Sequence, residues 1–260
     1  MRIVVLVKPV PDTTGTERLG DDLRLDRASS PPIVNPNDEY AVEQALRLVE
    51  AHGGEITLLT MAPAGATETM RKALAMGAHG GVLVSDDALA GACALSTARV
   101  LAAALATLEF DLVLCGIASS DGGGGVVASG VATLCGLPYL SYAGSVEVTD
   151  DRVRIHRLHA TGYMVLEAPL PALVVVTQIA VGEPRYASLK GIMAARSRVI
   201  RSLSLADLGL DPAAVGGAAA STRVLGVRPP AVRGATRVVR GSAADAAREI
   251  VDFLDERRFI

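Results

Sequence analysis

The first half of this 260-residue chain alternates short, β-branched apolar runs with Ala- and Leu-rich stretches that have the period of a helix. The strand-like runs cover residues 2–7, 55–61, 80–85 and 110–116. The helical stretches cover residues 38–53, 66–77 and 92–108, and a further helix is expected to open in the glycine run at residues 122–125. Strands that alternate with helices pair in parallel, because each helix returns the chain to the same edge of the sheet. The alternation therefore predicts a doubly wound, mostly parallel α/β sheet of the Rossmann-like kind.

The pattern changes near residue 139. Residues 145–158 alternate apolar and polar side chains around an Asp-Asp turn, which predicts an antiparallel β-hairpin added to the sheet. Residues 170–178 form an apolar run typical of a strand that is buried on both faces. Residues 211–235 are rich in Pro, Gly and Ala and are expected to form an extended C-terminal arm, which precedes a helix with Ser242 at its N-cap.

Composition excludes several classes of partner. The formal net charge of −3 offers no broad basic surface for nucleic acid, and no uncharged apolar stretch is long enough to span a bilayer. The first residues are strand-like and lack a following cleavage site of small residues. Cys93, Cys115 and Cys135 are odd in number and set among apolar neighbours, as expected of reduced core thiols. We therefore expect a cytoplasmic protein without direct membrane insertion.

A glycine-rich run, SSDGGGGVVASG at residues 119–130, directly follows the fourth strand-like run. In an open α/β sheet, ligands bind beyond the carboxyl ends of the strands, and glycines before a helix leave backbone N–H groups free for a phosphate. Ser119 and Ser120 add hydroxyl donors, and Asp121 would cap the helix or accept a hydrogen bond from a ribose or an amino group. The run is neither GxGxxG nor a Walker A loop, so a plain glycine-rich turn into a close-packed helix stays an equal alternative.

A second polar segment, VNPNDEY, leads into the first long helix. Asn35 and nearby backbone groups are placed to contact an adenine ring or a phosphate at the same sheet edge. The local interpretation that we favour is simpler: Asn37 or Asp38 caps the helix.

Several blocks in order along the chain carry a family resemblance. They read VKPVPDT, NPNDEYAVEQALRL, TMRKALAMGAHGGVLVSD, DLVLCGIASSD and, most specifically, EPRYASLKGIMAARSRVI. The chain resembles the beta subunit of the electron transfer flavoproteins. This implies an adenine-nucleotide-binding α/β fold and a heterodimer with an alpha subunit. The two subunits share a redox-active FAD, and the beta subunit holds AMP, or a second FAD, as a structural ligand.

The resemblance also assigns residues to the nucleotide pocket. These are Leu6, Asn35, Pro36, Asn37, Asp38, Met61, Ala118, Ser119, Ser120, Asp121, Gly122, Gly123, Gly124, Gly125, Val126, Val127 and Ser129.

The family uses the segment after PRY to recognise an acyl-CoA or other flavin-dependent dehydrogenase. The resemblance makes Leu189 the apolar anchor, with Ile192 and Met193 as supporting core; the alternative is that all three pack on one helix face. Arg185 belongs to the same partner-docking segment. Arg185, Arg196, Arg198 and Arg201 would complement an acidic rim on the partner or face the alpha subunit's flavin phosphates, unless they are simply solvated.

The change of composition beyond Ile200 predicts a division of the chain at residue 200. The α/β core covers residues 1–200, including the recognition segment at about 183–198. Residues 201–260 form the arm and helix, which are expected to pack on the partner subunit.

The chain departs from the family pattern at three positions. Ala160 and Met164 stand where the family usually has acidic residues that help to hold the alpha subunit's flavin domain, and Glu167 comes three residues too late to replace them. Val126 stands where many members have a glutamine, so one hydrogen bond to the nucleotide is expected to be missing.

No constellation of acid, base or nucleophile stands out, so we expect an electron carrier subunit without catalytic residues. His156 and His159 would point to opposite faces of a hairpin strand, which argues against a metal site. One alternative is a hydrolase module, for which Lys8 is the only nearby cation by sequence. Another is a homodimeric adenine-nucleotide-binding sensor.

Overall fold

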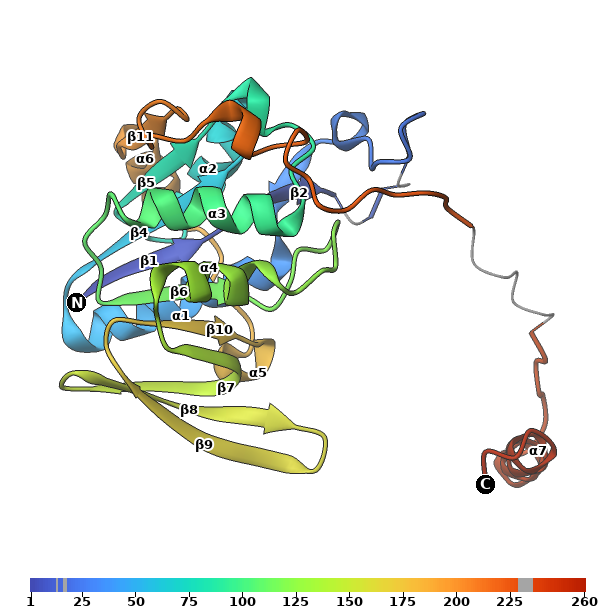
Figure 1. The fold of residues 1–260 in the computed structure, drawn as a ribbon. Coiled ribbons are helices and arrows are strands. Elements are labelled where there is room, and N and C mark those ends of the chain that lie inside the picture. The colour runs from blue at the N-terminus through green and yellow to red at the C-terminus, as the bar shows by residue number, and fades with distance from the viewer. Residues whose placement is uncertain (13, 16–17, 229–235) are drawn as a thin grey trace. The chain divides into compact units, whose positions relative to one another are not determined.

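A computed structural model describes residues 1–12, 14–15, 18–228 and 236–260. The chain divides into two compact units, Met1–Val224 and Leu225–Ile260, which are described separately. The first unit contains a nine-stranded sheet in the order β11-β5-β4-β1-β6-β10-β7-β8-β9, and a short two-stranded sheet of β2 and β3 (Figure 1). The strands are β1 (Arg2–Leu6), β2 (Pro9–Pro11), β3 (Pro32–Val34), β4 (Glu55–Met61), β5 (Gly80–Val84), β6 (Leu112–Gly116), β7 (Tyr139–Thr149), β8 (Arg152–His159), β9 (Gly162–Pro169), β10 (Ala172–Val176) and β11 (Ile200–Leu203).

Helices cover both faces of the large sheet. They are α1 (Pro36–His52), α2 (Thr67–Leu74), α3 (Ala94–Leu105), α4 (Val127–Cys135), α5 (Gln178–Val181) and α6 (Leu189–Ser197). Side chains of α1 and α2 pack on one face of the central strands, and those of α3 and α4 pack on the other. Cys115 is buried between them, whereas Cys93 and Cys135 are partly exposed, so the expectation of core thiols holds only for Cys115.

The strand order confirms the predicted doubly wound fold. The strands from β11 through β7 pair in parallel, and β1 lies between β4 and β6. From β1 the chain proceeds to β4 and β5 on one side, and then crosses to β6 on the other side. The order therefore reverses between β1 and β6, so this is the point where ligands of open α/β sheets bind.

An antiparallel extension follows the parallel strands. β7 and β8 form the predicted hairpin, which turns at Asp150 and Asp151, and β10 is buried along its whole length as predicted. The sequence reading missed β9, which pairs antiparallel with β8 at the edge of the sheet. Tyr163, Met164 and Val165 are consecutive and all exposed, so β9 lacks the alternation that identifies a half-buried strand.

The compact first unit extends beyond the expected boundary at residue 200. β11 pairs in parallel with β5, from Ile200 against Gly81 to Leu203 against Val84, and Leu205 and Val215 are buried in the core. These contacts place the division after Val224 instead. The second unit contains α7 (Ala243–Glu256), where the Ser242 side chain accepts a hydrogen bond from the Asp245 amide and so caps the helix as predicted. Among the helices of the described residues, none is both long and apolar enough to cross a membrane.

Candidate functional site

The carboxyl ends of β1 and β6 bring the predicted nucleotide-site segments together. Gly116, the last residue of β6, lies so close to α1 that an added Cβ atom would stand 2.4 Å from the carbonyl oxygen of Asn37. A side chain at this position would therefore separate the strand end from the helix. Leu6 ends β1 and Met61 ends β4, which is the next strand in the sheet. The predicted residues from β1, α1 and the loop after β6 thus share one edge.

Two asparagines fix the loop after β6. The amides of Asn35 and Asn37 each donate to the carbonyl of Ala118 over 2.9 Å, and the Asn35 side-chain oxygen accepts from the Ser120 amide. Asn35 occupies the N-cap position of α1 but makes no side-chain capping bond. The interpretation that Asn37 or Asp38 caps the helix is therefore wrong. The side chains of Asn35 and Asn37 instead hold the loop after β6, which lies 81 to 85 residues further along the chain.

Asp38 is a buried carboxyl at the same edge. Its Oδ2 accepts a hydrogen bond of 2.8 Å from the Lys8 amide. Burial raises the pKa of Asp38 from 3.8 to about 7, although hydrogen bonds from Asn35 and from the amides of Lys8 and Gly116 act in the opposite direction. Asp38 thus links the ends of β1 and β6, and its protonation state changes near neutral pH.

The glycine run leaves room and donors for a ligand. Gly123 and Gly125 have φ angles of 59° and 62°, which L side chains rarely adopt, and a Cβ atom added at Gly123 or Gly124 would meet no atom within 4 Å. In the described part of the chain, the N–H groups of Gly124, Gly125 and Val126 donate to no backbone carbonyl. Helix α4 begins only at Val127, just after the run, and has no side-chain cap. An adenine nucleotide would fit this open loop, because free amides at a helix N-terminus bind phosphate.

Asp121 has another role than the predicted helix cap. Its side chain is only 2% exposed, and it accepts from Lys8 Nζ at 2.7 Å and from Arg27 Nε at 2.8 Å. Sequence analysis missed Arg27, which lies 94 residues away in the loop between β2 and β3. No local motif marks Arg27, so only the folded chain reveals this pairing. Ser129 donates to the carbonyl of Val126 and so stabilises the first turn of α4.

The predicted docking segment is attached to α1 through Arg185. The Arg185 guanidinium donates to Glu43, with Nε 2.8 Å from Oε2, and also to Glu50. Arg47 donates to the same Glu43 carboxylate and to the carbonyl of Val181. Burial alone would raise the pKa of Glu43, but the hydrogen bonds from Arg185 and Arg47 outweigh it and hold this pKa below its ordinary value. Arg185 therefore holds the docking segment against helix α1.

Helix α6 presents its apolar side chains to solvent. Leu189 is 76% exposed, and Tyr186, just before the helix, is 94% exposed. Ile192 and Met193 are also exposed, so the interpretation of these two as supporting core is wrong. Because Leu189 is exposed as well, the alternative that all three side chains simply pack along one face of the helix is also wrong. In α6 only Ala195 is buried.

The backbone of α6 is nevertheless firmly seated. An added Cβ at Gly191 would stand 2.2 Å from the carbonyl oxygen of Ala75, and Arg71 donates to the carbonyl of Ala195. Arg196 lies in the last turn of α6 and Arg198 follows at its C-cap. Arg201 donates to the hydroxyl of Thr107. The segment thus combines a fixed backbone with exposed apolar side chains.

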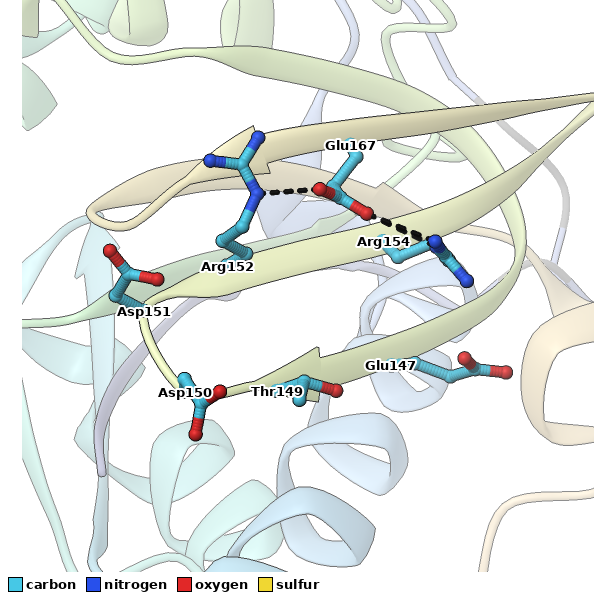
Figure 2. Close-up of a pocket in the computed structure, with 7 residues that line it drawn as sticks. All are labelled: Glu147, Thr149, Asp150, Asp151, Arg152, Arg154 and Glu167. Carbon is cyan, nitrogen blue, oxygen red and sulfur yellow. Dashed lines mark hydrogen bonds and ion pairs between the residues drawn. The ribbon is translucent and has the colours of Figure 1, made fainter.

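A surface hollow of about 290 Å³ lies at the turn between β7 and β8 (Figure 2). Glu167 pairs with both Arg152 and Arg154 across one wall (Figure 2). Glu167 is the carboxylate that would have to replace the acidic residues missing at Ala160 and Met164, and it is already paired with two arginines. Met164 lies opposite Arg157 in the β8–β9 ladder. The hollow shares no residue with the glycine run, and of its lining side chains Arg152, Arg154 and Glu167 pair with one another.

The reversed strand order and the glycine-rich loop beside it place the chain among doubly wound α/β proteins of the Rossmann-like class. A family model described as the electron transfer flavoprotein domain matches residues 22–208. The chain is 38% identical over 265 residues to the electron transfer flavoprotein subunit beta of Mycobacterium leprae (strain TN), with 99% of each chain covered. The chain belongs to the electron transfer flavoprotein family, among its beta subunits.

Two further relatives are named for particular electron-transfer complexes. The chain is 32% identical over 267 residues to the acryloyl-CoA reductase electron transfer subunit gamma of Anaerotignum propionicum. It is 34% identical over 263 residues to the caffeyl-CoA reductase-Etf complex subunit CarD of Acetobacterium woodii (strain ATCC 29683 / DSM 1030 / JCM 2381 / KCTC 1655 / WB1). In both cases the alignment covers 100% of each chain.

Proposed function

We propose that this chain forms a heterodimer with an FAD-carrying alpha subunit and shuttles electrons between a dehydrogenase and a downstream acceptor. FAD, when bound, accepts and releases the electrons. The chain itself contributes a rigid sheet, a nucleotide site and a docking segment, and it supplies no acid, base or nucleophile to the reaction. Membership in a family of electron transfer subunits supports this proposal.

The glycine run is the single feature that carries the nucleotide part of the proposal. Within residues 1–12, 14–15, 18–228 and 236–260, the amides of Gly124, Gly125 and Val126 donate to no backbone carbonyl, and the space beside Gly123 and Gly124 is open. These features suit the phosphate of AMP or of a second FAD held as a structural ligand. The side chains of Asn35 and Asn37 would keep the loop in shape for that ligand.

The docking part rests on α6 and the residues before it. Leu189 would enter an apolar pocket of the dehydrogenase, with the exposed Ile192 and Met193 beside it, while Arg185 holds the base of the segment on α1. A single anchoring side chain gives modest and reversible binding, as electron exchange between separate proteins requires. The names of the CoA-thioester reductase relatives favour a dehydrogenase that acts on a CoA thioester.

Co-purification tests the proposal. The chain is expressed with a tag, together with a candidate alpha subunit encoded in the same organism. A yellow 1:1 complex is expected, and chromatography of the nucleotide released on denaturation should identify AMP or FAD beyond the shared flavin. A colourless homodimer that binds no larger subunit would refute the proposal and would favour a nucleotide sensor.

A further inference from the structure

Beside the glycine run, one buried carboxylate is shared by two cations. Asp121 accepts from Lys8 Nζ through Oδ1 and from Arg27 Nε through Oδ2. Burial raises the pKa of Asp121, but the hydrogen bonds and charge of Lys8, together with Arg27, outweigh burial and hold this pKa below its ordinary value. The carboxylate is therefore ionised at neutral pH. One negative and two positive charges leave an excess of positive charge at the loop.

Both cations retain donors that Asp121 does not use. Arg27 binds Asp121 through Nε alone, and in the described residues its two terminal NH₂ groups have no hydrogen-bond partner. Lys8 donates to Ser119 Oγ at 3.2 Å as well as to Asp121, and the third of its N–H donors has no partner among the residues that the structure describes. The side chains of Lys8 and Arg27 are 39% and 51% exposed, so these donors are accessible from solvent.

The cations also lie next to the glycine run. A Cβ atom added at Gly122 would stand 3.9 Å from Lys8 Nζ. Arg27 is bound through Nε to Asp121, the residue immediately before Gly122. At the end of this run, the amides of Gly124, Gly125 and Val126 donate to no backbone carbonyl of the described chain.

We propose that Arg27 and Lys8 bind the phosphate of the nucleotide held by the glycine run, and that Asp121 orients the Arg27 fork toward it. This inference rests on the proposed nucleotide site and adds residues that the family resemblance did not assign. A guanidinium fixed through Nε presents its terminal N–H groups as a planar fork, which matches the geometry of phosphate oxygens. The site would accordingly recognise a phosphorylated adenine nucleotide and bind the unphosphorylated nucleoside weakly.

Isothermal titration of the heterodimer, after removal of its bound nucleotide, tests this inference with AMP, FAD and adenosine. Arg27→Gln should weaken the binding of whichever nucleotide the parent binds by about tenfold, which is typical for loss of a partly exposed charged hydrogen bond. It should leave adenosine binding within about twofold. Arg27→Lys keeps the charge but loses the fork, so an intermediate loss is expected. Arg24→Gln, in the same segment but not bonded to Asp121, is the matched control and should bind like the parent.

The results distinguish a phosphate contact of Arg27 from a structural role of this residue and from the absence of a nucleotide site. Equal loss of nucleotide and adenosine in Arg27→Gln would mean that Arg27 only holds the loop in shape, and unchanged binding of both would mean that it has no role; either overturns the inference and leaves the nucleotide site intact. A parent heterodimer that binds neither AMP nor FAD would refute the nucleotide site itself, and the inference with it. Far-UV circular dichroism melts of each variant verify that the fold is retained.

Discussion

Replacing Asp38 with asparagine should remove the largest pH-dependent contribution that this edge of the sheet makes to stability. The pKa of Asp38 is about 7 in the folded chain, because of burial, and 3.8 in the absence of the fold. Between these values the folded chain keeps a proton that the unfolded chain has released, so stability falls as the pH rises. Each pH unit below the folded pKa corresponds to about 1.4 kcal/mol, and the carboxyl is half ionised at pH 7, so a loss of about 2 kcal/mol is predicted between pH 5 and pH 7.

Asparagine has the shape of the protonated carboxyl and can still accept the hydrogen bond from the Lys8 amide. The Asp38→Asn chain should therefore lose little stability at pH 5 and be the more stable of the two above pH 7. Urea unfolding of the full-length chain, followed by far-UV circular dichroism from pH 5 to pH 8, measures both profiles. Asp22→Asn, an exposed carboxyl, is the control and should parallel the parent. Parallel profiles for the parent and Asp38→Asn would refute the reasoning.

Three further predictions concern docking, nucleotide binding and the attachment of the docking segment. Leu189→Ala should slow flavin reduction by the partner dehydrogenase about tenfold at limiting concentration, with flavin content unchanged, because the exposed anchor is lost. Gly124→Val should release most of the structural nucleotide, measured by chromatography after denaturation, while the thermal midpoint of the ligand-free chain stays the same, since the added side chain meets only open space. Glu43→Gln should lower the free energy of unfolding by about 1–2 kcal/mol in urea, because two arginines lose a buried carboxylate that is 4% exposed.

Matched variants make these predictions specific. Leu95→Ala removes an exposed leucine on α3 and should leave the reduction rate unchanged; equal slowing in both variants would argue against an anchor. In Gly65→Val the added side chain also meets open space, but away from the glycine run. If this variant lost as much nucleotide as Gly124→Val, the loss could not be assigned to the loop after β6. Glu50→Gln removes the more exposed partner of Arg185 and should cost less than about 0.5 kcal/mol. A cost equal to that of Glu43→Gln would contradict the central role of the buried carboxylate.

Local patterns identified the parallel core but not the edges of the sheet. The alternation of apolar runs and helical stretches predicted the central strands and their helices because burial on both faces leaves continuous apolar runs. β9 and β11 escaped prediction because edge strands have less burial and hence a weaker pattern. Capping by Asn37 or Asp38 was a reasonable local prediction. In the folded chain, however, the Asn37 amide donates to the carbonyl of Ala118, which is 81 residues away.

The doubly wound architecture and the position of the glycine run after a buried strand could both be predicted, since they follow from short-range periodicity and composition. Folding sets which distant side chains meet: Arg27 with Asp121 beside that run, and Arg185 with Glu43, 142 residues away, at the docking segment. Such pairs depend on strand order and on the path of the loops between strands. A periodicity that spans a few residues carries no information about either.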